Sequence, residues 1–317
     1  MLWPVQLLKA RQGSLYLAPR HQYAWWGAFR DRLAFPWHDY CGIFCRGSDS
    51  GTAQQRQART RGKLENLVDL HSHILPGWYG EEPTLQQALE IVRAAAEHGV
   101  SAIVLTPNVR TAEDAHDRAV AIPLVVRWFQ EEIDSLQIPV TVFPGAELEP
   151  GPHVISALKR LAPITLAATG RYVLLEAAGN RFSSLAELAK RLSATGFHVV
   201  LGNPERAQEV QDKPAIISDL VNAGALVQIA AASLAAPGNA REWSSASMLL
   251  VMGMVHFIST AGYPSDTHYG HLAEAVRIAA QIVGKEQALR LVTENPRKVL
   301  QGEPLEGDLI QAAQAAS

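Results

Sequence analysis

Short apolar runs alternate with segments of helical periodicity from Leu67 onward. Seven of these runs are rich in β-branched or large apolar residues, and they span 67–70, 101–105, 140–143, 172–175, 197–201, 225–230 and 255–258. Each is apolar at nearly every position, as expected for strands that are covered on both faces. Buried strands that alternate with helices predict a parallel α/β fold.

The segments between these runs carry apolar residues at helical spacing. The first helix begins near Thr84 and Gln87, which fit a capping box, and Gly99 is placed to end it. Further helices are predicted over 113–135, 184–195, 213–223, 241–252, 270–282 and 286–293. A closed or nearly closed parallel βα barrel is the simplest arrangement of these units. An open doubly wound sheet is the alternative, although no G-x-G-x-x-G follows the first strand.

The first 65 residues have a different texture and predict a separate segment. They carry ten Lys and Arg against four Asp and Glu, whereas 66–317 carries eighteen against twenty-seven. The stretch from Gly47 to Lys63 is polar and rich in Gln and Arg. We expect 1–65 to be disordered or to be upstream sequence read from a mis-set start codon, with a small aromatic docking element as the alternative. Residues 306–317 are expected to form a C-terminal tail.

Composition narrows the classes of function. The net charge of −3 argues against a general nucleic-acid binder. The two cysteines, Cys41 and Cys45, are too few to predict a zinc site or a disulfide framework. The chain has neither an apolar run of transmembrane length nor a start typical of a signal peptide. We therefore expect a cytoplasmic protein without direct membrane insertion.

Polar residues gather where the predicted strands end, which is where parallel βα barrels carry their chemistry. The first strand ends in D-L-H-S-H, which contains His71 and His73, and the third leads to Glu147. Two histidines that are two residues apart on an extended strand point to the same side. They can then share one metal ion, because imidazole suits transition metals. The alternative is a pair of histidines with no functional role.

Several short motifs follow one another in a characteristic order. They are D-L-H-S-H-I-L-P-G (69–77), T-P (106–107), P-G-A-E (144–147), R-Y-V-L-L-E (171–176), N-P-E-R (203–206), V-Q-I-A-A-A-S-L (227–234), V-H-F-I-S (255–259) and E-N-P (294–296). This order resembles the polymerase-and-histidinol-phosphatase (PHP) superfamily, and within it the bacterial capsule-type protein-tyrosine phosphatases. The likeness spans about 66–305.

The resemblance implies a distorted, TIM-like, seven-stranded parallel βα barrel with a cluster of manganese-type divalent ions. It also implies hydrolysis of phosphotyrosine on the tail of a bacterial tyrosine kinase that controls polysaccharide export. His71, His73 and Glu147 match metal-ligand positions of the family, and Arg206 matches an arginine that contacts the phosphate. The family's remaining aspartate and histidine ligands are replaced by Tyr79, Gly80, Asn108, Asn203, Thr260 and Gly262.

These replacements remove charge that a metal cluster needs. Two divalent ions about 3.5 Å apart repel each other by roughly 19 kcal/mol at an effective dielectric constant of about 20. Carboxylates normally offset this repulsion, and here two aspartates are lost while Glu147 remains. We therefore expect at most one ion, manganese or a similar divalent metal, on His71, His73 and Glu147. Three protein ligands can support such an open site.

Two groups of nearby residues are alternative ligands. Asp266 and His268 repeat the lost closing pattern six residues downstream, although a solvated loop explains them equally simply. Glu81 or Glu82 stands close to the missing aspartates, and the alternative there is a pair of carboxylates in the first turn of a helix.

Three hypotheses for function remain. The first is a degenerate phosphatase that still binds a phosphotyrosine tail or another partner in polysaccharide assembly. The second is a weakly active phosphatase with one metal ion, and the third is a barrel used only for structural interactions. The retained Arg206 together with the lost ligands favours the first.

Overall fold

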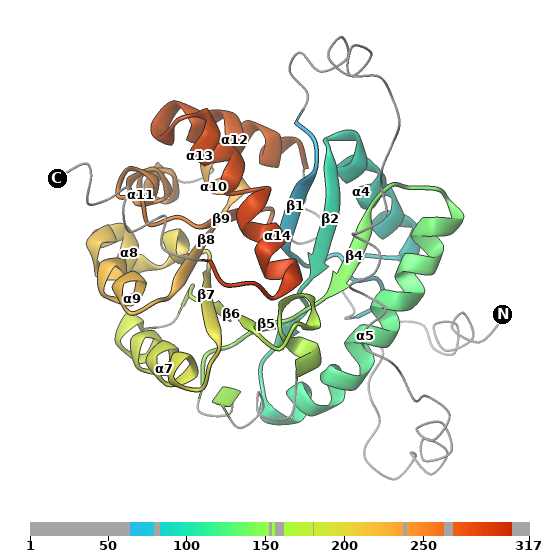
Figure 1. The fold of residues 1–317 in the computed structure, drawn as a ribbon, viewed down its shortest axis with the longest axis horizontal. Helices are drawn as coiled ribbons and strands as arrows, with labels where there is room; N and C mark the ends of the chain where they lie inside the picture. Colours follow the sequence, from blue (N-terminus) through green and yellow to red (C-terminus); the bar gives the residue numbers. More distant parts are fainter. Residues whose placement is uncertain are drawn as a thin grey trace. The chain divides into compact units, whose positions relative to one another are not determined.

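The structure, a computed structural model, describes seven stretches of the chain. They are residues 64–78, 83–151, 154–155, 162–179, 181–236, 240–262 and 269–305. Within them the fold is α/β with parallel strands, as predicted, and helices surround centrally placed strands (Figure 1). The extension expected over 1–65 falls outside these stretches except for its last two residues, and so does the tail over 306–317. The proposed domain boundaries therefore stay predictions.

All seven predicted strands are present. They are β1 (Leu67–Ser72), β2 (Val100–Leu105), β4 (Thr141–Pro144), β6 (Tyr172–Glu176), β7 (His198–Gly202), β8 (Leu226–Ala230) and β9 (Phe257–Ser259). Two further strands of two residues, β3 (Asn108–Val109) and β5 (Glu147–Leu148), were not predicted. Each resumes the preceding strand after a two-residue break. Pro107, in the first break, has no N–H to donate to a ladder.

The strands form two parallel sheets, with the orders β1-β2-β4 and β3-β5-β6-β7-β8-β9. At the other edge of the second sheet, the residues after β9 lie beside β1. The Ala261 N–H donates to the carbonyl oxygen of His71 over 2.8 Å, and the His73 N–H donates to that of Gly262 over 3.3 Å. No ladder pairs β9 with β1 among the strands described, so isolated bonds bridge this seam instead of the closed ladder of an ideal barrel.

The described helices pack around the strands. The α-helices are α4 (Leu85–Glu97), α5 (Ala112–Ser135), α7 (Phe182–Ala194), α8 (Gln208–Asp212), α9 (Ser218–Asn222), α10 (Ala231–Ala235), α11 (Ala240–Val251), α12 (Tyr269–Val283), α13 (Lys285–Arg290) and α14 (Glu294–Gln301). The 3₁₀ helices are η4 (Ala162–Ile164), η5 (Leu166–Ala168), η6 (Pro204–Arg206) and η7 (Pro214–Ile217). None of the helices described here combines the length and apolarity needed to cross a membrane.

The predicted ends of α4 are confirmed. Thr84 and Gln87 form the capping box. Gly99 has a φ of +86°, and a side chain there would collide with the carbonyl oxygen of Leu64. The single helix predicted over 213–223 is divided between η7 and α9, which together cover Pro214–Asn222. Lys213 stays outside them with a φ of −147°, because the residue before a proline is disfavoured in the helical conformation.

The strand faces turned away from the helices carry an apolar cluster of their own. Its members are Val68, Leu70, Ala102, Val104, Phe143, Leu166, Tyr172, Leu174, Val200, Leu226, Phe257, Val299 and Leu300. The last two come from α14, which crosses in front of the strands in Figure 1. Alternation along β7 and β8 places Gly202 and Gln228 on this inner face, at the carboxyl ends.

Candidate metal centre

Three buried side chains, from β1, from the residue that follows it and from β5, converge at the carboxyl ends of the sheets. The Nε2 atoms of His71 and His73 are 3.0 Å apart. The Nε2 of His71 is 3.4 Å from Oε1 of Glu147, and the Nε2 of His73 is 3.4 Å from Oε2. Among the residues that the structure describes, this is the one group of three or more His, Cys, Asp or Glu residues whose ligand atoms gather this closely. The structure therefore brings together the three ligands expected from the sequence.

These separations fit a single ion. Nitrogen and oxygen ligands lie about 2.1 Å from zinc-sized cations. At that radius, tetrahedral coordination separates two donors by about 3.4 Å and octahedral coordination by about 3.0 Å. The observed distances between the donor atoms of His71, His73 and Glu147 span the same interval. Small shifts of these side chains would thus be enough to bind one cation.

The electrostatics of the group favour a cation. Burial raises the pKa of Glu147, but the charges and hydrogen bonds of His71 and His73 outweigh burial and hold that pKa below its ordinary value. Burial lowers the pKa of His73, and the charge of Arg206 acts in the same direction. For His71 burial also lowers the pKa, yet Glu147 and Gln228 reverse the effect and raise it. Glu147 is therefore an anion at neutral pH and can neutralise part of an ion's charge.

Two neighbours shape the centre and were missed in the sequence. Gln228 on β8 lies with Oε1 2.8 Å from Nδ1 of His71. It is the single polar residue of the apolar run 225–230, and this exception could have identified it as a functional residue. Gly202 at the end of β7 leaves space for the group, because a Cβ there would lie 3.2 Å from Oε1 of Glu147 and 3.4 Å from Cε1 of His71.

The described positions at which the resemblance implies replaced ligands use their polar atoms elsewhere. Oδ1 of Asn203 accepts a hydrogen bond from Nε2 of Gln228 over 3.1 Å. The hydroxyl of Thr260 donates to Oδ2 of Asp69, and the Thr260 N–H donates to Oδ1 over 3.0 Å. Gly262 contributes its carbonyl oxygen to the seam beside β1. None of these three residues supplies a carboxylate oxygen to the centre.

Of the other positions with an implied replacement, Asn108 is described by the structure. Asn108 begins β3 and pairs with Glu147 in the ladder with β5, and its carbonyl oxygen accepts from Arg118. Tyr79 and Gly80 lie outside the described residues. The alternative ligands Glu81, Glu82, Asp266 and His268 also lie outside them.

Arg206, the expected phosphate contact, lies on η6 just after β7. Its side chain is about one-third exposed, and its Nε is 3.9 Å from Oε2 of Glu242 on α11. The preceding residue, Glu205, is fully buried and fixes this turn, because its Oε1 accepts from the Ala230 N–H over 2.9 Å and from the Ser233 hydroxyl over 2.8 Å. Arg206 is thus a partly accessible cation on an anchored turn.

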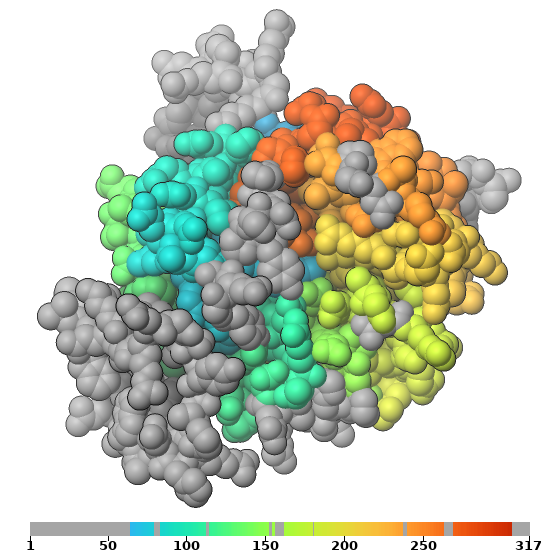
Figure 2. Space-filling model, turned by 180° about the vertical axis from the view of Figure 1, so that it is seen from behind, coloured from blue at the N-terminus to red at the C-terminus, as the bar shows by residue number. Residues whose placement is uncertain are grey.

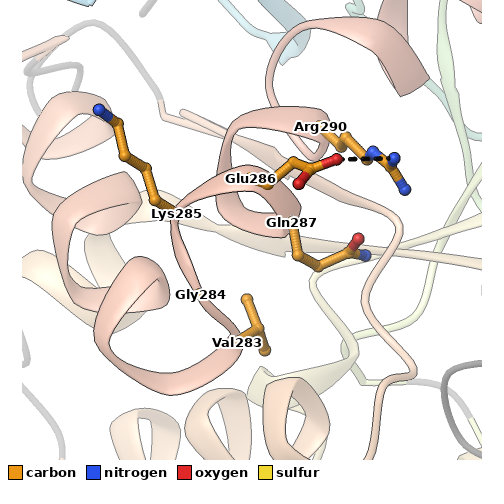
Figure 3. A pocket seen from close by; sticks show the side chains of 6 residues that line it. All are labelled: Val283, Gly284, Lys285, Glu286, Gln287 and Arg290. Atoms are coloured by element: carbon orange, nitrogen blue, oxygen red, sulfur yellow. Dashed lines mark hydrogen bonds and ion pairs between the residues drawn. The ribbon is translucent and has the colours of Figure 1, made fainter. Parts of the chain in front are cut away.

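A surface hollow of about 320 Å³ lies at the junction of α12 and α13 and is lined by residues outside the candidate metal centre. Its lining is Val283, Gly284, Lys285, Glu286, Gln287 and Arg290, and Figure 3 shows Glu286 paired with Arg290 on the same helix, 3.0 Å apart. It includes none of the centre's ligands. In the space-filling view from the other side, the blue of the described stretch 64–78 is visible between the cyan and the orange segments (Figure 2).

Comparisons with known proteins agree with this fold. A family model described as capsular polysaccharide synthesis, CpsB/CapC, matches residues 67–301. Tyrosine-protein phosphatase YwqE of Bacillus subtilis is 28% identical over 244 residues, which cover 75% of this chain and 93% of that protein. Tyrosine-protein phosphatase CpsB of Streptococcus agalactiae is 25% identical over 245 residues, which cover 74% of this chain and 98% of that protein.

Solved structures show the same fold. One is from a study of YwqE from Bacillus subtilis and CpsB from Streptococcus pneumoniae, described there as unique metal-dependent tyrosine phosphatases. It has a TM-score of 0.66 at 24% identity and covers 76% of this chain and 96% of its own. A lactonase from Listeria monocytogenes has a TM-score of 0.51 at 11% identity, with the same coverage. With a family model that spans most of its length, the chain belongs to the capsular polysaccharide synthesis family CpsB/CapC.

Proposed function

We propose that this chain is a phosphotyrosine-binding member of the CpsB/CapC family that holds at most one divalent ion and has impaired or no phosphatase activity. One observation carries the proposal. His71, His73 and Glu147 meet at one point, whereas Asn203 and Thr260 direct their polar atoms to protein partners. Among the described residues, Glu147 is the one carboxylate grouped with both imidazoles, and one carboxylate offsets little of the repulsion within a metal cluster.

The proposed ligand follows from the relatives and from Arg206. Both curated relatives are named tyrosine-protein phosphatases, and a guanidinium is suited to a phosphate because its planar fork can donate two parallel hydrogen bonds. The proposed partner is the phosphotyrosine tail of a bacterial tyrosine kinase, which implies a cytoplasmic location. Phosphate would replace the long contact of Arg206 with Glu242. A bound ion, manganese or a similar metal, would polarise the phosphate and activate water.

Peptide binding tests the recognition. A peptide with phosphotyrosine should bind the protein, and the same peptide with tyrosine should bind at least tenfold more weakly. Arg206→Ala should remove most of this preference, since a hydrogen bond to a charged group contributes about 1.5–3 kcal/mol. Arg241→Ala is the matched control, because Arg241 is exposed and pairs with Asp212. Equal binding of both peptides, unchanged by Arg206→Ala, would leave only a structural role for the barrel.

Two measurements test the proposed centre: the number of tightly bound metal ions and the rate of phosphate ester hydrolysis. Purified protein that has been equilibrated with manganese or zinc should hold no more than one tightly bound ion per chain, and His71→Ala should hold none. Two or three tightly bound ions would contradict the proposal. The second candidate, a weakly active one-ion phosphatase, is favoured by the fit of the three donors to an open site. Metal-dependent hydrolysis of p-nitrophenyl phosphate that His71→Ala abolishes would establish that candidate.

A further inference from the structure

The amide of Gln228 has a defined orientation. Its Nε2 lies 2.8 Å from the carbonyl oxygen of Ile229 and 3.1 Å from Oδ1 of Asn203. A backbone carbonyl oxygen only accepts hydrogen bonds, so the Ile229 contact requires the amide nitrogen on that side. The amide oxygen of Gln228 must then face the other way, toward His71.

This orientation determines which nitrogen of His71 carries a hydrogen. Oε1 of Gln228 lies 2.8 Å from Nδ1 of His71, and an amide oxygen has no hydrogen to donate. Nδ1 must therefore be the donor. A neutral imidazole with its hydrogen on Nδ1 has its lone pair on Nε2. That Nε2 is the atom that faces His73 and Glu147.

We propose that Gln228 is a positioning residue, which fixes the tautomer of His71 so that Nε2 presents its lone pair to the ion, and that Asn203 acts through Gln228. The consequence for metal binding rests on the proposed one-ion centre, whereas the tautomer does not. Histidine ligands of metal ions commonly donate their second N–H to a partner that fixes the ring in this way. Here the partner is a neutral amide that is fully buried.

Asn203 is suited to this role by its backbone. Its φ of 51° lies in the left-handed region, which asparagine adopts more readily than most residues. Its N–H donates to the carbonyl oxygen of Gln228 over 2.9 Å, so the two residues are joined by a backbone bond and a side-chain bond. The residue at this replaced ligand position thus supports a ligand without binding the ion itself.

The tautomer can be measured on the metal-free protein. Long-range ¹H–¹⁵N correlation of the imidazoles in alkaline buffer should show His71 with its hydrogen on Nδ1, with assignment from the signals that His71→Asn removes. Gln228→Glu keeps an acceptor and should preserve this state, whereas Gln228→Leu should shift His71 toward the Nε2–H form. Gln130→Leu is the matched control, since Gln130 also bridges backbone groups through its amide, at the edge of β4.

Zinc affinity, measured at one pH by competition with a chromophoric chelator, gives the second readout. Gln228→Leu should weaken binding about 10- to 100-fold, as loss of such supporting partners does. Asn203→Gly keeps the positive φ accessible and should weaken binding less, because Ile229 still holds the amide. Asn203→Asp retains an acceptor and should behave like the wild type. If Gln228→Leu fails to fold, Asn203→Gly carries the test through both readouts.

The outcomes separate this inference from the proposed function. Wild-type His71 with its hydrogen on Nε2, or a tautomer that Gln228→Leu and Asn203→Gly leave unchanged, would overturn the role of Gln228. A wild-type protein with the expected tautomer that binds no zinc would support that role and instead overturn the one-ion centre. The expected tautomer together with zinc binding that weakens in both variants would support the two together.

Discussion

Thr260 supports a buried carboxyl group beside the candidate centre. Its hydroxyl and its N–H both donate to Asp69. Burial raises the pKa of Asp69, and the hydrogen bonds from Thr260 and His71 counter that effect in part. Threonine here supplies donors to a buried carboxyl group, where a second carboxylate would repel it. The resemblance singled out Thr260 as a substituted position, but its partner Asp69 was not predicted, because no local pattern joins residues 191 positions apart.

A residue-scale prediction concerns Gly202. Gly202→Ala would place a methyl group 3.2 Å from both Oε1 of Glu147 and Cδ1 of Leu174, closer than ordinary van der Waals contact, so both side chains must move by a few tenths of an ångström. We expect metal affinity to fall about tenfold, because the carboxylate is displaced, with a small loss of stability from the shift of Leu174. Chelator competition and thermal unfolding measure the two effects. Gly224→Ala is a control for the glycine exchange itself, since a Cβ there meets no atom within 4 Å, although its φ of +93° adds strain.

At the scale of elements, apolar periodicity correctly predicted the strands and helices whose formation depends on local sequence. The seven strands and the long helices follow from apolar spacing, and Thr84 and Gly99 define the ends of α4. The short strands β3 and β5 were missed because two residues carry no period, and they form only because Asn108 and Glu147 are paired across the sheet. Gln228 was missed for a similar reason, since its role depends on side chains from other strands.

An element-scale prediction concerns the η6 turn. Glu205→Ala removes the acceptor of the Ala230 N–H and the Ser233 hydroxyl, which should destabilise the protein by about 1–3 kcal/mol. It should also weaken phosphopeptide binding, because the turn carries Arg206. Glu205→Gln keeps an accepting oxygen and should retain most of both properties. Urea unfolding and peptide titration are the measurements, and equal loss in the Ala and Gln variants would contradict the anchoring role.

At the scale of the whole molecule, stability should depend on a buried histidine outside the centre. Burial lowers the pKa of His256 to about 4, and its Nδ1 accepts from the Val227 N–H. The fold thus favours neutral imidazole, so this contribution is complete above pH of about 6.5 and is lost as the pH falls toward 4. The loss amounts to about 3 kcal/mol. His256→Asn keeps an acceptor without this titration, so its unfolding free energy should vary less over that interval. Parallel profiles for the two proteins would contradict the assignment.

The seam between β9 and β1 has a consequence for how the molecule opens. Neighbouring strands within each sheet are paired in ladders, whereas this boundary is bridged by isolated backbone bonds of His71, His73, Ala261 and Gly262 and by side-chain bonds such as those between Thr260 and Asp69. Local openings start where backbone bonding is sparse. His71 and His73 are also the candidate imidazole donors, so an ion bound there would stabilise the contact between β1 and the residues after β9. Ion binding and local opening at this boundary would then be coupled: the bound ion would make opening less favourable, and opening would release the ion.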